Sequence, residues 1–174
     1  TVSDEAPFVT LARALIAEAD GHEADWPGML AVFQARADRV RSTPARIARR
    51  YCSIYRVRPR PLTANQQIMI RPLRGSRQRP SEFSPDLRAL YNRARQIELQ
   101  AMPLEMPDGR RDQWTRAAAL AQRWLAGDHE HGCSETPTHF GGPRADRARA
   151  LRTRWVVVTC PGSLSGFWRE RGRR

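Results

Sequence analysis

The chain has 174 residues, of which 40% are hydrophobic, enough for one domain with a hydrophobic core. Thirty basic residues against eighteen acidic ones give a net charge of +12, and every basic residue is arginine, so we expect anionic partners: nucleic acid, acidic lipid or an anionic cell-wall polymer. No run reaches the roughly twenty apolar residues that a transmembrane helix needs, which excludes such a helix within this sequence.

The first helical pattern ends in an acid. Apolar residues at Phe8, Leu11 and Leu15 predict a helix over 6–19, and the next position in this spacing is Glu18. A carboxylate at the edge of a core is costly to ionise, so we expect its pKa to be raised toward the range that a general acid needs near neutral pH. The alternative is a solvated last-turn residue or a salt-bridge partner.

Further helical patterns follow in chain order. Asp25 is placed to cap a helix that runs to Arg41. The next three helical segments are 43–55, 64–70 and a long one from Ser84 to just before Pro103. A last helix over 111–126 is closed by Gly127, and the arginine- and proline-rich stretches 56–61 and 71–80 are predicted loops.

The character of the chain changes after Gly127. Residues 128–174 have little helical pattern, are rich in Gly, Pro and Cys, and contain one β-like run, 155–159. We therefore expect a mainly α-helical single domain over 1–174, with 128–174 as a loop-rich subregion that holds a short β element.

The cysteines suggest one disulfide. Cys133 and Cys160 flank a loop-rich stretch where a bridge would contribute about 2–4 kcal/mol, while two unlinked buried thiols are the alternative, and Cys52 would remain free. The same stretch holds four residues of metal-binding type: His129, His131, Cys133 and His139. Their spacing matches neither a CxxC pair nor an HExxH helix, so we expect no metal and no cofactor.

Two groups of residues together resemble a known family. One is Leu15-Ile-Ala-Glu18-Ala, a short loop with Asp25, and the helix from Met29 to Arg39. The other is Cys133, then His139-Phe-Gly-Gly-Pro143, 155–160 and Phe167-Trp168. In this order they resemble the two ends of lysozyme-like cell-wall hydrolases and lytic transglycosylases of phage and bacteria, whereas 51–109 carries no matching motif.

The resemblance implies a lysozyme-like domain that cleaves the β-1,4 bond between N-acetylmuramic acid (MurNAc) and N-acetylglucosamine (GlcNAc). Glu18 would act as the general acid and then as the base, taking a proton from the muramyl 6-hydroxyl in a lytic transglycosylase or from water in a muramidase. A second carboxylate would favour hydrolysis. Asp20, Glu23 and Asp25 are near in sequence, but each is expected to be a loop or cap residue.

The resemblance also implies partners and a location. The substrate would be the peptidoglycan glycan strand, with anionic cell-wall polymers as further partners, for a bacteriolytic monomer such as a phage endolysin in the cell envelope, the periplasm or the extracellular space. The candidate substrate-binding residues are His139, Phe140, Tyr91 and Asp20. A hydrogen-bonded structural role is the alternative for His139.

Two other functions stay open. Arginine clusters at 46–60, 71–79 and 169–174 would suit a basic protein that binds nucleic acid non-specifically, although no sequence-reading element is recognisable. The second is a catalytically inactive relative that binds peptidoglycan without cleaving it.

Overall fold

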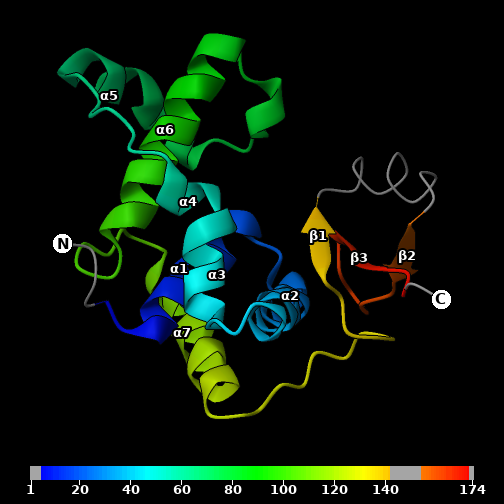
Figure 1. The fold of residues 1–174 in the computed structure, drawn as a ribbon. Helices are drawn as coiled ribbons and strands as arrows, with labels where there is room; N and C mark the ends of the chain where they lie inside the picture. Colours follow the sequence, from blue (N-terminus) through cyan, green and yellow to red (C-terminus); the bar gives the residue numbers. More distant parts are fainter. Residues whose placement is uncertain (1–4, 142–153, 173–174) are drawn as a thin grey trace.

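The computed structural model describes residues 5–141 and 154–172 (Figure 1). Within these residues the fold is mainly helical, as predicted, with seven α-helices followed by a small three-stranded sheet. The α-helices are α1 (Pro7–Glu18), α2 (Trp26–Arg39), α3 (Pro44–Tyr51), α4 (Ser53–Arg56), α5 (Ala64–Ile70), α6 (Pro85–Ala101) and α7 (Arg111–Leu125). Three 3₁₀ turns are η1 (Glu23–Asp25), η2 (Arg71–Gly75) and η3 (Pro80–Glu82). None of the helices in the described residues has the length and apolar content that a membrane crossing requires.

Helix α1 lies at the centre of the core. Its residues Leu11 and Leu15 are fully buried, and α1 packs chiefly on α7 and also on α3 and α6. Trp114 and Trp124 of α7 point into this core, as the amphipathic pattern of that helix predicts. Because α1 is packed on several sides, the position of its C-terminal end is fixed, and Glu18 lies at this end.

The predicted helix 43–55 is two helices. Thr43 caps α3 by accepting a hydrogen bond from the N–H of Arg46 at 3.3 Å, but Cys52 adopts an extended conformation and separates α3 from α4. The prediction of one continuous helix was wrong because the Cys52 side chain is almost fully buried at this break. Ser53 therefore begins a new helix, whose first N–H groups have no partner within the helix.

The segment before α6 also differs from its prediction. Residues 71–80 were expected to form a loop, but η2 occupies its first half, and η3 begins at Pro80. Helix α6 itself is confirmed, with Ser84 as its N-cap accepting from the N–H of Leu87 at 3.4 Å. Its far end is set by the Met102-Pro103 dipeptide.

The sheet follows the helical part in the chain and packs against α2 (Figure 1). Strands β1 (His139–Gly141), β2 (Trp155–Val158) and β3 (Gly166–Glu170) lie in the order β1-β3-β2, both pairs being antiparallel. The ring of Phe167 lies 2.8 Å from the point that a Cβ on Gly28 would occupy, so only glycine fits there without a shift. The predicted β run is confirmed as β2, whereas β1 and β3 were not predicted as strands.

The disulfide between Cys133 and Cys160 is confirmed, and Cys52 is a free, buried thiol. The bridge ties the segment before β1 to the segment after β2. Because the two cysteines are 27 residues apart in sequence, the bridge closes most of the C-terminal region into a loop.

Candidate functional site

Glu18 is the last residue of α1, and its side chain is exposed to solvent. The chain turns sharply after it, with Gly21 at a φ of 77°, in the left-handed region that glycine favours. The indole N–H of Trp26 donates to the carbonyl of Ala19 at 3.3 Å and so attaches the start of α2 to the end of α1. The position of Glu18 is therefore set by a packed helix rather than by a free loop.

The surroundings of Glu18 favour its protonated form. Burial of the carboxylate among neighbouring protein atoms raises its pKa above the ordinary value of 4.5, even though its edge reaches solvent. Three groups act in the opposite direction: the N–H of Ser53 and the thiol of Cys52 as hydrogen-bond donors, and the charge of Arg95. The raised pKa was predicted from the sequence, whereas these three partners were not.

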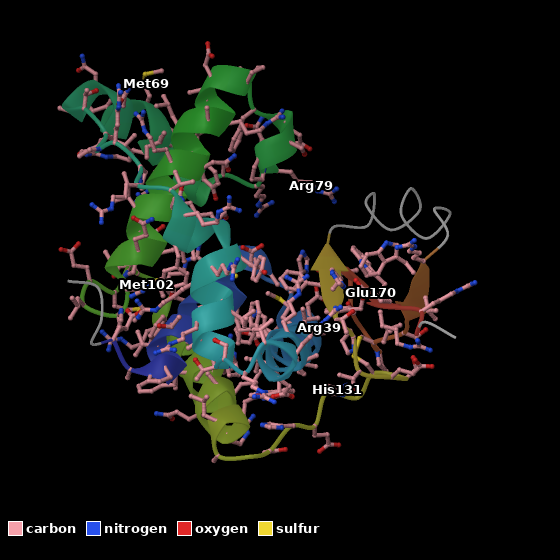
Figure 2. All side chains as sticks on the ribbon, viewed as in Figure 1. Arg39, Met69, Arg79, Met102, His131 and Glu170 are labelled. Atoms are coloured by element: carbon pink, nitrogen blue, oxygen red, sulfur yellow. A yellow bond between two sulfur atoms is a disulfide. The ribbon has the colours of Figure 1, made fainter. Side chains whose placement is uncertain are left out.

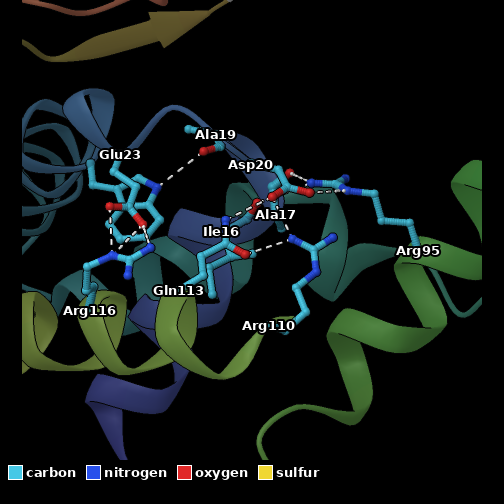
Figure 3. Close-up of polar contacts among 10 residues, drawn as sticks. Ile16, Ala17, Ala19, Asp20, Glu23, Arg95, Arg110, Gln113 and Arg116 are labelled. Carbon is cyan, nitrogen blue, oxygen red and sulfur yellow. Dashed lines mark hydrogen bonds and ion pairs between the residues drawn. The ribbon is translucent and has the colours of Figure 1, made fainter. Parts of the chain in front are cut away.

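Asp20 is only two residues from Glu18, but its carboxylate is fully engaged (Figure 3). Arg95 donates to it at 3.0 Å, Arg110 at 2.6 Å and Gln113 at 2.9 Å. Burial alone would raise the pKa of Asp20, but the hydrogen bonds from Arg110 and Gln113 and the two guanidinium charges outweigh it and lower the pKa to about 2. In this structure Asp20 joins α1 to α6 and α7.

Arg95 connects Asp20 with Glu18. Its guanidinium also donates to the carbonyl oxygens of Ile16 and Ala17 at 3.2 and 3.1 Å, two of the carbonyls that the end of α1 leaves without helical partners (Figure 3). The same side chain thus caps α1, holds Asp20 and places a positive charge near Glu18. No sequence signal links Arg95 to residues some 75 positions earlier.

The other two nearby carboxylates are engaged as well. Glu23 forms an ion pair with Arg116 at 2.7 Å (Figure 3). Asp25, 1% exposed, accepts hydrogen bonds from the N–H groups of Leu164 and Ser165 and from the Ser165 hydroxyl. The prediction that the Asp25 side chain caps α2 was wrong, because its carboxylate bonds this distant loop instead.

The candidate residues of the C-terminal region lie in the sheet. His139 is half-buried, its Nδ1 lies 2.9 Å from the Thr138 hydroxyl, and its ring packs against Trp155 at 4.2 Å between centroids. Phe140 packs on Phe33 of α2 at 5.9 Å, which makes it part of the core contact between sheet and helix. Gly142 and Pro143, the end of the predicted motif, lie outside the described residues.

Tyr91 of α6 lines a hollow of about 470 Å³ together with Arg95, Glu98 and Arg110. A neighbouring hollow of about 530 Å³, between α5, η2 and α6, shares Arg74 and Glu98 with it. Glu18 is not among the residues that line these two hollows. Arg95 is the side chain that lies in the first hollow and also acts on Glu18.

The histidine-rich stretch does not converge on a metal site. Cys133 is in the disulfide, the ring of His129 stacks on Trp124 at 4.7 Å, and His131 accepts from the N–H of Cys133. Among the residues that the structure describes, no group of three or more His, Cys, Asp and Glu side chains is close enough to hold a metal ion.

Comparisons of this chain with protein-family models, with curated proteins and with solved structures gave no match.

Proposed function

We propose that the protein is a peptidoglycan-cleaving glycosidase with a single lysozyme-like domain, in which Glu18 is the general acid and base. One observation carries the proposal. Glu18 is a solvent-exposed carboxylate with a raised pKa and without an ion pair to any described residue, whereas Asp20, Glu23 and Asp25 are each bound to other groups. A carboxyl group whose pKa is raised and which a substrate can reach is suited to protonate a glycosidic oxygen.

The first step is a proton transfer. The Glu18 carboxyl donates its proton to the oxygen between MurNAc and GlcNAc, the bond from the anomeric carbon to this oxygen breaks, and positive charge develops on the muramyl ring. Glu18 is then a carboxylate. The N–H of Ser53 and the charge of Arg95 stabilise that ionised form, and its own negative charge stabilises the sugar cation.

The surroundings of Glu18 favour the transglycosylase reaction over hydrolysis. A muramidase would use a second carboxylate, but the three nearest in sequence are occupied in ion pairs and hydrogen bonds. With Glu18 alone, the muramyl 6-hydroxyl oxygen attacks the anomeric carbon while Glu18 takes the hydroxyl proton. This step yields a 1,6-anhydromuramyl product and restores the protonated carboxyl.

The test is mass spectrometry of fragments released from purified peptidoglycan. The wild type should release fragments that end in 1,6-anhydromuramic acid, and Glu18→Gln should lower this release by about 10²-fold or more, as expected for loss of a general acid. Glu23→Gln is the matched control, since it neutralises a carboxylate in the same connection and should leave release within about twofold of the wild type. Circular dichroism of each variant checks the fold.

Other outcomes would contradict the proposal in distinct ways. Fragments that end in reducing muramic acid would show that the reaction is hydrolysis. A group other than Asp20, Glu23 or Asp25 would then have to position the attacking water. Loss of activity in Glu98→Gln but not in Glu18→Gln would move the acid to the hollows beside α6. No release from several wall types would leave a binding protein without cleavage.

A further inference from the structure

One part of the chain carries an excess of positive charge equal to the net charge of the whole protein. Between Arg39 and Ser81 there are twelve arginines and neither aspartate nor glutamate, and this segment therefore accounts for the whole net charge of +12. The rest of the sequence holds equal numbers of basic and acidic residues. A general preference for arginine in the sequence would not separate the two signs in this way.

Seven of these arginines lie in the stretch 56–79, which leads from the end of α4 through α5 and η2. All seven are exposed: Arg56, Arg58, Arg60, Arg71, Arg74, Arg77 and Arg79. None of them forms an ion pair with a described acidic residue. In contrast, Arg39 and Arg49 pair with Glu170 and Glu5. These charges are therefore available to an external anion.

The same stretch exposes aliphatic side chains. Ile68 is 60% and Met69 50% exposed on α5, while the next residue, Ile70, is buried and fixes this helix against the body of the protein. Figure 2 shows Met69 on the outer side of α5. Val57, at the end of α4, is also exposed. Such large apolar side chains at the surface indicate an interaction site when they are grouped.

Two of these arginines, Arg71 and Arg74, lie next to the exposed aliphatic residues of α5, whereas Arg79 lies on the other side of α6 (Figure 2). Arg71 and Arg74 follow directly after α5 and share a hollow with Pro61 and Leu62, so the segments just before and just after α5 lie together. Glu98 and Glu105, from and just after α6, lie in the same hollow. Arg71 and Arg74 are exposed at the edge of this hollow, and Arg71 lies three helical positions after the exposed Ile68, so the two side chains are neighbours.

We propose that this α5–η2 surface, residues 64–75, docks on a bilayer of anionic phospholipid. The charges match lipid phosphates, and the exposed aliphatic side chains would enter the boundary between headgroups and acyl chains. Nucleic acid fits this surface less well. Its phosphates could bind the arginines, but it has no apolar surface that would contact Ile68 and Met69. Residues 56–79 also contain no aromatic side chain on which bases could stack.

The test is co-sedimentation of the full chain with vesicles of phosphatidylglycerol and phosphatidylcholine, or of phosphatidylcholine alone, at about 0.1 M salt. The protein should bind only the anionic vesicles. Binding should fall about tenfold both in Ile68→Ser with Met69→Ser and in Arg71→Gln with Arg74→Gln. Two control variants change exposed residues outside this surface: Leu104→Ser with Leu125→Ser, and Arg154→Gln with Arg171→Gln. Their vesicle binding should stay within about twofold of the wild type.

Absence of binding to the anionic vesicles would overturn the proposal, as would an equal loss in the two control pairs. Binding to duplex DNA that needs Arg71 and Arg74 but is unchanged by the serine pair, together with weak vesicle binding, would identify the surface as a nucleic-acid site instead. The vesicles contain no glycan, so the result is independent of the role proposed for Glu18. Because all substituted side chains are exposed, each variant should keep the wild-type circular dichroism spectrum.

Discussion

The helical region, residues 7–125, and the sheet region, residues 139–170, are stabilised in different ways. All the helices except α5 contribute to a continuous apolar core around α1, so these six helices add contacts of the same kind. The three strands have only three to five residues each. They depend on particular links: the Cys133–Cys160 bridge, the packing of Phe167 on Gly28, and the hydrogen bonds between Asp25 and the loop before β3.

This difference shows that a region without a large core of its own concentrates its stability in a few groups. A substitution in the helical core removes one of many contacts, whereas the loss of one link removes a large share of what holds the sheet. It follows that variants at the links should have larger effects than polar variants at the end of α1.

The largest effect is expected for Asp25→Ala. It removes the acceptor of two backbone N–H groups and one hydroxyl at a buried position, and we expect a loss of about 4 kcal/mol in the free energy of unfolding. Urea denaturation would measure it. Asp38→Ala, at an exposed position of α2, should cost less than about 0.5 kcal/mol, and equal losses in both variants would refute the role given to Asp25.

Removal of the disulfide should have the next largest effect. Cys133→Ser with Cys160→Ser releases a 27-residue connection in the unfolded chain and should cost about 3 kcal/mol. The melting temperature of the wild type should likewise be lower with reductant than without it, because reductant opens the same bridge. A thiol count on the unfolded, unreduced protein should find one free thiol, Cys52. A count of three would contradict the bridge.

Asp20→Asn should show a smaller, pH-dependent effect. The pKa of Asp20 falls from 3.8 to about 2 on folding, so its ionisation stabilises the fold above pH 4, and this contribution is lost as the pH falls toward 2. The variant should therefore be about 2 kcal/mol less stable than the wild type at neutral pH and nearly equal to it near pH 2. Urea titrations at several pH values would test this, and a difference independent of pH would refute it.

The smallest effect, with the opposite sign, is expected for Glu18→Gln. Because folding raises the pKa of Glu18 above 4.5, the wild type loses stability as the pH rises through that range, and glutamine removes the loss. The variant should be more stable at neutral pH by less than about 1 kcal/mol, since solvent screens the exposed carboxylate. Equal melting temperatures at acidic pH and a higher one for the variant at neutral pH would support this.

Local pattern predicts the helical region well. The apolar spacing and the caps at Thr43 and Ser84 depend on neighbouring residues, so α1, α2 and α6 appear within a few residues of their expected bounds. The break at Cys52 was missed because it depends on burial of that side chain beside α1 rather than on its neighbours in the chain.

The sheet and most of the site are determined over long distances in the sequence. Strands β1 and β3 are too short to show a pattern, and they pair with each other across 25 or more residues. Glu18 could be identified from the sequence because its carboxylate occupies a position where the spacing of neighbouring apolar residues predicts an apolar side chain. Its neighbours Ser53 and Arg95, and the partners of Asp20, come from other helices and carry no sequence mark of this role.

The bonds of Asp25 also bear on how the chain folds during synthesis. Its hydrogen-bond donors lie about 140 residues later, at Leu164 and Ser165. At ribosomal rates of about 5–20 residues per second, these donors are made roughly 7 to 28 s after Asp25 itself. During that time the start of α2 is complete in sequence but holds an unpartnered carboxylate. The hydrogen bonds that satisfy this carboxylate therefore form only after the loop before β3 has been synthesised.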